Sequence, residues 1–467
     1  MMESIDHFHT ALFIGVMCVV QTMGEICPYS DPGCSCGPYI TCYNLQEIPP
    51  INTTVDSSQV TSLIFEEGNI TSISDNSLPP GLSSLNLYHL PLANISDDAF
   101  DASAATLQDI YISRANLYSF PTALKKLTNL THLSFIDSVI QDWDTATLNQ
   151  SAATLENLAL INVSLPAWPS WISDLYLLRQ VDLSWNPLRN IPNDAFSSIN
   201  DSLTDLNLKG TDLTHIPGAL STLLSLRILD LQNNNFTDLS EFQYITGSPF
   251  AHNLSVLYLD FDGLTRVANF SSLAALITLS LSSNRISFVP AGSLPTSLTT
   301  LYLSNNSLAS VPEDVASMSK LSSLYLSTNI IGEIEQNAFP SSLTILNLAN
   351  NNLTIITNTT FRNLNLVTSL SLTSNPISTI SSAAFSDLVS LQYLYLIGSQ
   401  LTEIPLALAL LNPRINLYFT TTEQLSCPCP PNRQLSEFFT SVGYPAIFPD
   451  VCEDGQSVTS YLSGQCQ

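Results

Sequence analysis

The sequence predicts an open α/β solenoid: a horseshoe of about fifteen stacked repeats, with a parallel β-sheet on its concave side and a disulfide cap at each end. Three observations predict this fold. A pattern of leucines recurs every 22 to 28 residues along most of the chain. The cysteines lie near the two ends of the 467 residues. Apolar residues make up 45% of the sequence and charged residues 11%, which is enough apolar surface for a continuous core.

The repeat follows the pattern L-x-x-L-x-L-x-x-N-x-L-x-x-I/L-P, and a clear copy runs from Leu298 to Pro312. Its regularity excludes a chance recurrence of leucine. With weaker matches included, copies start at Val60, Leu82, Leu107, Leu130, Leu155, Leu178, Leu203, Leu226, Leu254, Leu276, Leu298, Leu321, Leu343, Val367 and Leu391.

The spacing within one copy predicts its local structure. The central x-L-x-L-x segment alternates with period two, so it forms a short strand with one apolar face. One unit cannot bury this face alone, whereas stacked units share a core. The asparagine stands where the chain leaves the strand, and its amide can bond buried backbone groups of adjacent turns. Seven copies keep it: Asn186, Asn234, Asn284, Asn306, Asn329, Asn351 and Asn375.

The two ends carry signals of export and oxidation. The apolar run 11–20 is too short to span a bilayer and indicates a signal peptide over residues 1–24, although this segment lacks the usual basic residues. Eight further cysteines form two groups of four, which favours disulfides made in an oxidising compartment. A metal site is the rival interpretation, but the Cys-x-Cys spacing lacks a Cys-x-x-Cys knuckle and neither group contains histidine, so we expect no metal. The groups are Cys27, Cys34, Cys36, Cys42 and Cys427, Cys429, Cys452, Cys466.

These features resemble the extracellular leucine-rich-repeat superfamily. Ala99-Phe100, Ala195-Phe196, Ala338-Phe339 and Ala384-Phe385 are similar to the A-x-F element of its animal-type repeat, and residues 27–49 resemble its N-terminal cap. The C-terminal match is looser, because Ser426 stands where the family often has an aromatic residue. The resemblance implies an N-terminal cap over 25–59, repeats over 60–414 and a C-terminal cap over 415–467. It also implies the pairs Cys27–Cys36, Cys34–Cys42, Cys427–Cys452 and Cys429–Cys466.

Charge and missing motifs exclude several classes of function. The chain has 13 Lys+Arg against 39 Asp+Glu, so its surface repels phosphate backbones and we expect no nucleic-acid partner. No serine-hydrolase elbow, zinc-protease motif, phosphate loop or dinucleotide fingerprint is present, and we expect neither catalysis nor a cofactor. Of the four histidines after residue 24, His89 and His132 are the pair that could approach one another on the sheet.

The concave face is the expected site of partner binding. Fifteen strands spaced about 4.8 Å apart would give a face roughly 70 Å long, which suits a protein or an extended ligand. In repeats two to six the register exposes large side chains where Leu90, Ala115, Ser138 and Val163 replace the asparagine, and exposed patches of this kind usually mark contact surfaces. The alternative is tolerated irregularity or packing on a neighbouring loop. The candidates are Tyr88, His89, Tyr111, Arg114, Ile136, Asp137, Ile161 and Trp185.

A second stripe on the same face begins with Tyr258, Asp260 and Phe261 in the ninth repeat. It continues with Tyr302, Tyr325 and Tyr395. We expect the tyrosines of repeats eleven and twelve to stack across strands, and simple cross-strand packing is the preferred explanation for this stripe.

Thirteen Asn-x-Ser/Thr sequons predict a glycosylated surface. Asn162 and Asn305 fall at the concave edge, and a glycan on Asn162 would lie close to the favoured patch. The sequons are Asn52, Asn69, Asn94, Asn129, Asn149, Asn162, Asn200, Asn235, Asn253, Asn269, Asn305, Asn352 and Asn358.

The longest spacing, 28 residues, places an insertion near residues 241–253, either a protruding contact loop or, as we prefer, a tolerated insertion.

Taken together, the sequence favours a secreted protein that binds an extracellular protein partner as ligand trap, adaptor or non-catalytic subunit. The membrane is not expected to anchor this chain. The alternatives are a receptor or co-receptor ectodomain and a structural component of the extracellular matrix.

Overall fold

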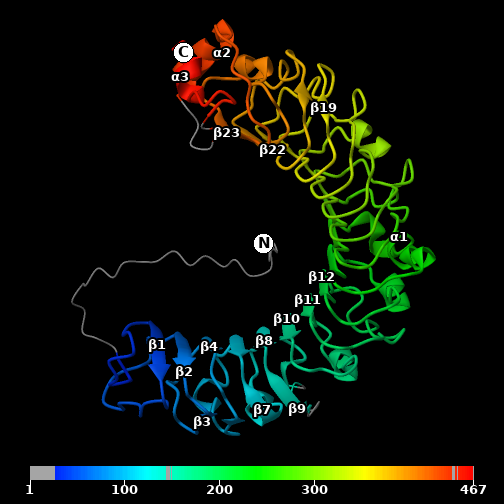
Figure 1. Ribbon diagram of the computed structural model, residues 1–467. Helices are drawn as coiled ribbons and strands as arrows, with labels where there is room; N and C mark the ends of the chain where they lie inside the picture. The colour runs from blue at the N-terminus through cyan, green and yellow to red at the C-terminus, as the bar shows by residue number, and fades with distance from the viewer. Residues whose placement is uncertain (1–26, 144–147, 149, 444–447, 450, 466–467) are drawn as a thin grey trace.

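The computed structural model describes residues 27–465 except 144–147, 149, 444–447 and 450. The chain forms an open arc in which the strands line the inner side and the connecting segments lie outside (Figure 1). The predicted signal peptide, the Asn149 sequon and Cys466 lie outside the described residues.

In the described part of the chain, 17 parallel strands make one continuous sheet along the concave side. Fifteen of them correspond to the fifteen repeats, while β1 and β23 extend the sheet into the two terminal segments. Successive strands pair in chain order. The strands are β1 (Tyr39–Leu45), β2 (Ser62–Gly68), β4 (Ser84–Tyr88), β6 (Asp109–Ser113), β8 (His132–Ile136), β10 (Asn157–Ile161), β11 (Gln180–Asp182), β12 (Asp205–Asn207), β13 (Ile228–Asp230), β14 (Val256–Tyr258), β15 (Thr278–Ser280), β16 (Thr300–Tyr302), β17 (Ser323–Tyr325), β18 (Ile345–Asn347), β20 (Ser369–Ser371), β22 (Tyr393–Ser399) and β23 (Asn416–Thr421).

The register aligns the strand leucines into buried rows. Leu279, Leu301 and Leu324 are direct partners on neighbouring strands, and all three are fully buried. The residue between the two leucines of each strand points to the concave face, as the period of two requires. The fold predicted from the repeat is therefore confirmed, with the core running continuously between the strands and the outer segments.

The outer side of the arc is built from short segments. Three two-stranded sheets lie there: β3 (Ser72–Ile73) with β5 (Asn94–Ile95), β7 (Asn116–Ser119) with β9 (Val139–Asp142), and β19 (Ile355–Ile356) with β21 (Thr379–Ile380). The segments between the inner strands also contain single turns of 3₁₀-helix: Asp101–Ser103, Thr122–Lys126, Ser170–Asp174, Gly218–Thr222, Glu313–Ser317 and Leu406–Leu410.

The insertion of the eighth repeat folds into consecutive helical turns on the outer side. They are the 3₁₀ turn Leu239–Phe242, helix α1 (Gln243–Thr246) and the 3₁₀ turn Pro249–His252 (Figure 1). Phe242, Ile245 and Phe250 are buried, and the rings of Phe242 and Phe270 pack edge to face with centroids 5.5 Å apart. The insertion thus adds to the core, as the preferred interpretation of a tolerated insertion allows, and a contact role for it stays a prediction.

Disulfides close both ends of the solenoid. Cys27–Cys36 and Cys34–Cys42 lie beside β1, and Cys427–Cys452 lies beyond β23. These are three of the pairs that the resemblance implies. Cys429 is also disulfide-bonded. Helices α2 (Arg433–Val442) and α3 (Val458–Leu462) cover the C-terminal end, where Phe438, Phe439 and Leu462 are buried.

The asparagine that recurs in seven repeats forms a ladder of hydrogen bonds through the stack. Asn284 Nδ2 donates to the carbonyl oxygens of Leu259 and Leu281, at 2.8 and 3.0 Å, and its Oδ1 accepts from the backbone N–H groups of Asp262 and Leu264. All seven asparagines donate to a carbonyl of the preceding repeat, as the sequence predicts. Each amide therefore satisfies backbone groups that water cannot reach.

Strand length changes where the ladder begins. Strands β2 to β10, in the first five repeats, all of which lack the asparagine, have five to seven residues, whereas strands β11 to β20 on the inner sheet have three. In these repeats Leu90 N–H donates to Ser113 O, and Arg114 N–H donates to Ile136 O, a bond that Asn305 N–H also makes with Ser327 O in a repeat with asparagine. Ser138 supplies a partial substitute, because its hydroxyl accepts from Ala115 N–H and donates to Ile136 O.

Asp262 occupies the asparagine position of the ninth repeat. Its side chain is fully buried, and its Oδ1 accepts from Asn234 N–H at 2.7 Å. Its Oδ2 is buried without a hydrogen-bond partner among the described residues. Burial is the main cause that raises the pKa of Asp262 to about 9. The hydrogen bond from Asn234 lowers this pKa, and the negative charges of Asp260 and Asp230 add smaller upward contributions. At neutral pH the group is therefore a carboxylic acid, which has one O–H donor where an asparagine amide has two N–H donors. Because Oδ2 makes no hydrogen bond, the carbonyls that an amide would satisfy are not reached, and the ladder has a defect here.

We predict that Asp262→Asn stabilises the protein. The folded-state pKa lies above the ordinary value of 3.8, so the contribution of Asp262 to stability is complete below about pH 4 and is lost as pH rises through about 9. Near pH 8 the variant should gain about 1–3 kcal/mol, the usual cost of an unsatisfied buried group, and near pH 4 the gain should shrink. Thermal unfolding across this range measures the difference. Asn329→Asp is the matched control and should create the same pH-dependent loss. Parallel stability profiles for wild type and Asp262→Asn would contradict the prediction.

Candidate functional site

The concave face has a regular row at its edge, which we call the rim row: the residue two positions after the second strand leucine of each repeat. From repeat two to repeat fifteen these residues have a left-handed backbone, with φ between about 49° and 73°. This conformation favours glycine and asparagine over bulky side chains. The rim row consists of His89, Arg114, Asp137, Asn162, Trp185, Gly210, Asn233, Phe261, Ser283, Asn305, Thr328, Asn350, Ser374 and Gly398.

Four of the candidate residues form a cluster at the N-terminal part of the face. The rings of Tyr88 and Tyr111 lie 4.6 Å apart, centroid to centroid. Ile136 and Ile161 are direct partners on β8 and β10. All four side chains are half-buried, so the cluster offers apolar area without standing fully in solvent. Burial, reinforced by nearby charges, raises the pKa of both tyrosines, which therefore stay neutral hydrogen-bonding groups.

The polar candidates lie at the rim beside this cluster. His89, Arg114 and Asp137 are exposed, and Asp137 Oδ1 accepts from Asn162 Nδ2 at 2.8 Å. His132 starts β8 and pairs with Asp109 at 2.7 Å, whereas His89 follows the end of β4. The two histidines therefore stand at opposite ends of their parallel strands.

Two rim-row residues are large, apolar and exposed. Trp185 is 48% exposed at φ 60°, and Phe261 is 49% exposed at φ 59°. A Cβ on Gly210 would come within 2.5 Å of Trp185 Cε3, so the indole lies against the glycine backbone of the next repeat. Lys209 Nζ lies 5.7 Å from the indole centroid, within range of a cation–π interaction.

Between these two aromatic residues lie acidic side chains that sequence reasoning gave too little weight. Asp182 and Asp230 hold the position between the strand leucines on β11 and β13, and Asp260 follows β14. Asp230 and Asp260 are buried, and burial is the main cause that raises the pKa of Asp230 to about 7 and that of Asp260 to about 6. The charge of Lys209 lowers both values. The aspartates between the strand residues of Val181-Asp182-Leu183 and Leu229-Asp230-Leu231 were a visible signal, although the sequence alone does not show the burial.

The second stripe divides into stacked pairs. Tyr302 and Tyr325 stack with centroids 4.7 Å apart and ring planes 10° apart, as the register predicts. Tyr395 stacks instead on Tyr418 at 4.8 Å, because β23 continues the sheet beyond the last repeat. Tyr258 is half-buried beside Asp230 and Asp260. Burial is the main cause that raises the pKa of Tyr258, and the charges of the two aspartates raise it further.

Most sequon asparagines are accessible. Of the twelve that the structure describes, ten are exposed, and Asn52 and Asn200 are half-buried. Asn162 and Asn305 stand in the rim row, while the stretch of that row from Trp185 to Ser283 contains no sequon. Glycosylation itself stays a prediction.

The repeats match known families. The model described as "Leucine rich repeat" matches residues 176–236 and 341–401, and that for two copies of leucine-rich repeats matches 296–338. Lumican of Mus musculus is 40% identical over 93 residues, which are 19% of this chain and 25% of lumican. Podocan of Mus musculus is 40% identical over 99 residues, 21% of this chain and 12% of podocan. The chain thus spans about a quarter or less of these relatives' lengths.

This chain is an animal-type leucine-rich-repeat protein with cysteine caps.

Solved structures agree on the fold of this leucine-rich-repeat protein. A leucine-rich-repeat protein of Leptospira interrogans superposes with a TM-score of 0.61 at 25% identity, covering 72% of this chain and 84% of that one. The Toll–Spatzle complex of Drosophila gives 0.63 at 20% identity, covering 87% and 58%. A plant peptide hormone receptor in complex with RGF2 gives 0.53 at 23%, covering 82% and 67%.

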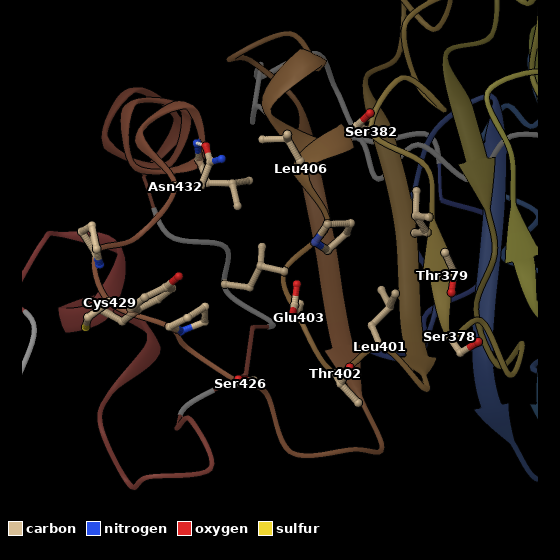
Figure 2. A pocket seen from close by; sticks show the side chains of 17 residues that line it. Ser378, Thr379, Ser382, Leu401, Thr402, Glu403, Leu406, Ser426, Cys429 and Asn432 are labelled. Atoms are coloured by element: carbon tan, nitrogen blue, oxygen red, sulfur yellow. Dashed lines mark hydrogen bonds between the residues drawn. The ribbon is translucent and has the colours of Figure 1, made fainter.

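A cavity of about 650 Å³ lies between the last repeats and the C-terminal cap (Figure 2). Leu401, Leu406 and Leu435 form apolar walls of the cavity, and Glu403 contributes a carboxylate. Burial raises the pKa of Tyr461, which also lines the cavity, and the charge of Glu403 raises it further. Among the described residues no group of three or more His, Cys, Asp or Glu could hold a metal ion. Within the same part of the chain no helix is long and apolar enough to cross a membrane.

We predict that Lys209→Met raises the pKa of Asp230 and of Asp260. The ammonium group lowers both values, so removing its charge leaves burial less opposed at both carboxyls, and at Asp230 also the repulsion from Asp182 and Asp260. Carboxyl-carbon NMR on aspartate-labelled protein would follow each titration, with Asp230→Asn and Asp260→Asn assigning the signals. Asp262 is the internal control, because Lys209 is not among the groups that shift its pKa, so its midpoint should stay the same. Unchanged midpoints for Asp230 and Asp260 would show that Lys209 does not act on them.

Proposed function

We propose that this leucine-rich-repeat protein is secreted and binds an extracellular protein partner on its concave face, as a ligand trap, adaptor or non-catalytic subunit. The disulfides support the extracellular setting, because such bonds persist in oxidising compartments. The N-terminal signal over residues 1–24 and the caps over 25–59 and 415–467 belong to the same proposal.

The observation that carries the proposal is the run of aromatic and branched side chains on consecutive strands. Tyr88, Tyr111, Ile136 and Ile161 lead along β4 to β10, and Trp185 follows β11 at the rim. Aromatic anchors flanked by polar groups such as Arg114 are typical of binding hot spots. Toll was solved with Spatzle, and the plant receptor with RGF2. The likeness to them is one of fold, so the argument for binding rests on these side chains.

The proposal does not include catalysis. The histidines that could have cooperated, His89 and His132, stand at opposite strand ends, and each described acid with a large pKa shift is buried in the stack or on its floor. A rigid concave sheet with fixed aromatic side chains is suited to recognition, because little side-chain entropy is lost on binding.

We predict that Tyr111→Ala and Trp185→Ala each weaken capture of the native partner from extracellular fluid by about tenfold or more, the typical effect of truncating an aromatic hot spot. Quantitative affinity capture with the whole protein measures this. Tyr393→Ala is the matched control, because Tyr393 is also an exposed aromatic residue, 41% exposed, on the distant strand β22. If both variants capture the same partners as wild type, the concave cluster does not carry binding.

A further inference from the structure

The stretch of concave face from Trp185 to Phe261, which we call the Trp185–Phe261 surface, combines exposed aromatic groups with buried acids. Both aromatic residues stand at rim-row positions where the neighbouring repeats have Gly210, Asn233 and Ser283. A bulky side chain at positive φ costs more than glycine or asparagine there, and the exposed half of each ring returns no burial energy. Folding of the repeat therefore does not account for these two side chains.

The indole of Trp185 is held in place before any partner arrives. Gly210 leaves room for the ring to lie on the backbone, since any Cβ there would meet it at 2.5 Å. The ammonium of Lys209, 5.7 Å from the ring centroid, shows that a cation is accommodated beside this ring. The site is thus an aromatic platform already matched to positive charge.

The floor of the surface has an excess of negative groups. Asp182, Asp230 and Asp260 supply three carboxyls to the one ammonium of Lys209, and Asp182 and Asp260 each act on Asp230 with like charge. Carboxyls in a poorly solvated place interact strongly with any cation brought above them. The whole chain has the same sign, with 39 acidic and 13 basic residues. A second copy of this chain would bring like charge and is disfavoured as the occupant.

No predicted glycan falls in the rim row of this surface, and the exposed sequon Asn235 stands two residues beyond Asn233. The two rim-row sequons, Asn162 and Asn305, stand on either side of it, and the row between them contains none. An extended segment lying along this part of the arc would pass between the two attachment points.

We propose that the Trp185–Phe261 surface docks a basic segment of a protein partner, with an arginine or lysine side chain placed against Trp185 and above the carboxyls of the floor. The inference rests on the proposed function, because it names the chemistry of the partner that the concave face binds. Opposite charge across such an interface speeds association and selects the partner.

The test measures how tightly a short synthetic peptide of alternating arginine and serine binds to the whole protein. A peptide of alternating glutamate and serine, which carries the opposite charge, is the control. We expect the arginine peptide to bind, the glutamate peptide not to bind, and affinity to fall as salt rises. Trp185→Asn and Phe261→Asn place a residue type that the rim row already uses, so both variants should fold, which thermal unfolding verifies. Each should weaken the arginine peptide by about tenfold, whereas Tyr393→Ala should not.

Two results would overturn the inference. The first is that the arginine peptide does not bind. The second is that wild type and the Trp185→Asn/Phe261→Asn double variant bind it equally, which would mean that the negative charge of the whole protein, and not this surface, attracts the peptide. Capture of the native partner by the same variants separates this failure from that of the proposed function. Capture lost with Tyr111→Ala while the arginine peptide fails to bind leaves the proposed function standing. Capture insensitive to every concave variant removes the proposed function whatever the peptide does.

Discussion

The asparagine ladder is the interaction on which the stacked architecture depends. A solenoid turn leaves backbone N–H and C=O groups inside the stack, and each would cost about 1–3 kcal/mol if left unpaired. In seven repeats one amide serves carbonyls of two turns and accepts from the backbone of the preceding repeat, as Asn284 does for Leu259, Leu281 and Leu264. The bonds connect neighbouring repeats directly, so the ladder fixes the stacking distance that lets the strand leucines meet in rows.

Where the ladder is absent, the protein uses a different solution. The five N-terminal repeats pair longer strands and add two small sheets on the outer side, β3–β5 and β7–β9. This part of the arc also carries the Tyr88–Tyr111 cluster. Loss of the asparagine alone does not lengthen a strand, because β12 and β14 have three residues although Thr211 and Asp262 stand at the asparagine position of their repeats. The longer strands are therefore a property of the N-terminal repeats as a group.

The repeat fold was predictable because its signal is periodic and repeated many times. Strand leucines, the ladder and the stacked pair of Tyr302 and Tyr325 all follow from register alone. Features that depend on packing between particular repeats were not predictable in the same way. The insertion around α1 looked like a loop until Phe242 and Phe250 were seen to be buried. The sheet also continues to β23, where Tyr418 pairs with Tyr395, although no further repeat is recognisable there.

The candidate site was predicted in position but not in chemistry. Register placed Trp185 and Phe261 on the concave side, yet it did not show that both stand at positive φ or that Asp230 and Asp260 are buried between them. A single strand position can be apolar, aromatic or acidic without disturbing the core, because it points away from the leucine rows. The fold therefore constrains the leucines and asparagines tightly and leaves the concave positions free. For that reason, residues that cost conformational energy at those positions, such as Trp185 at the rim, are better evidence of selection for binding than residues that merely fit.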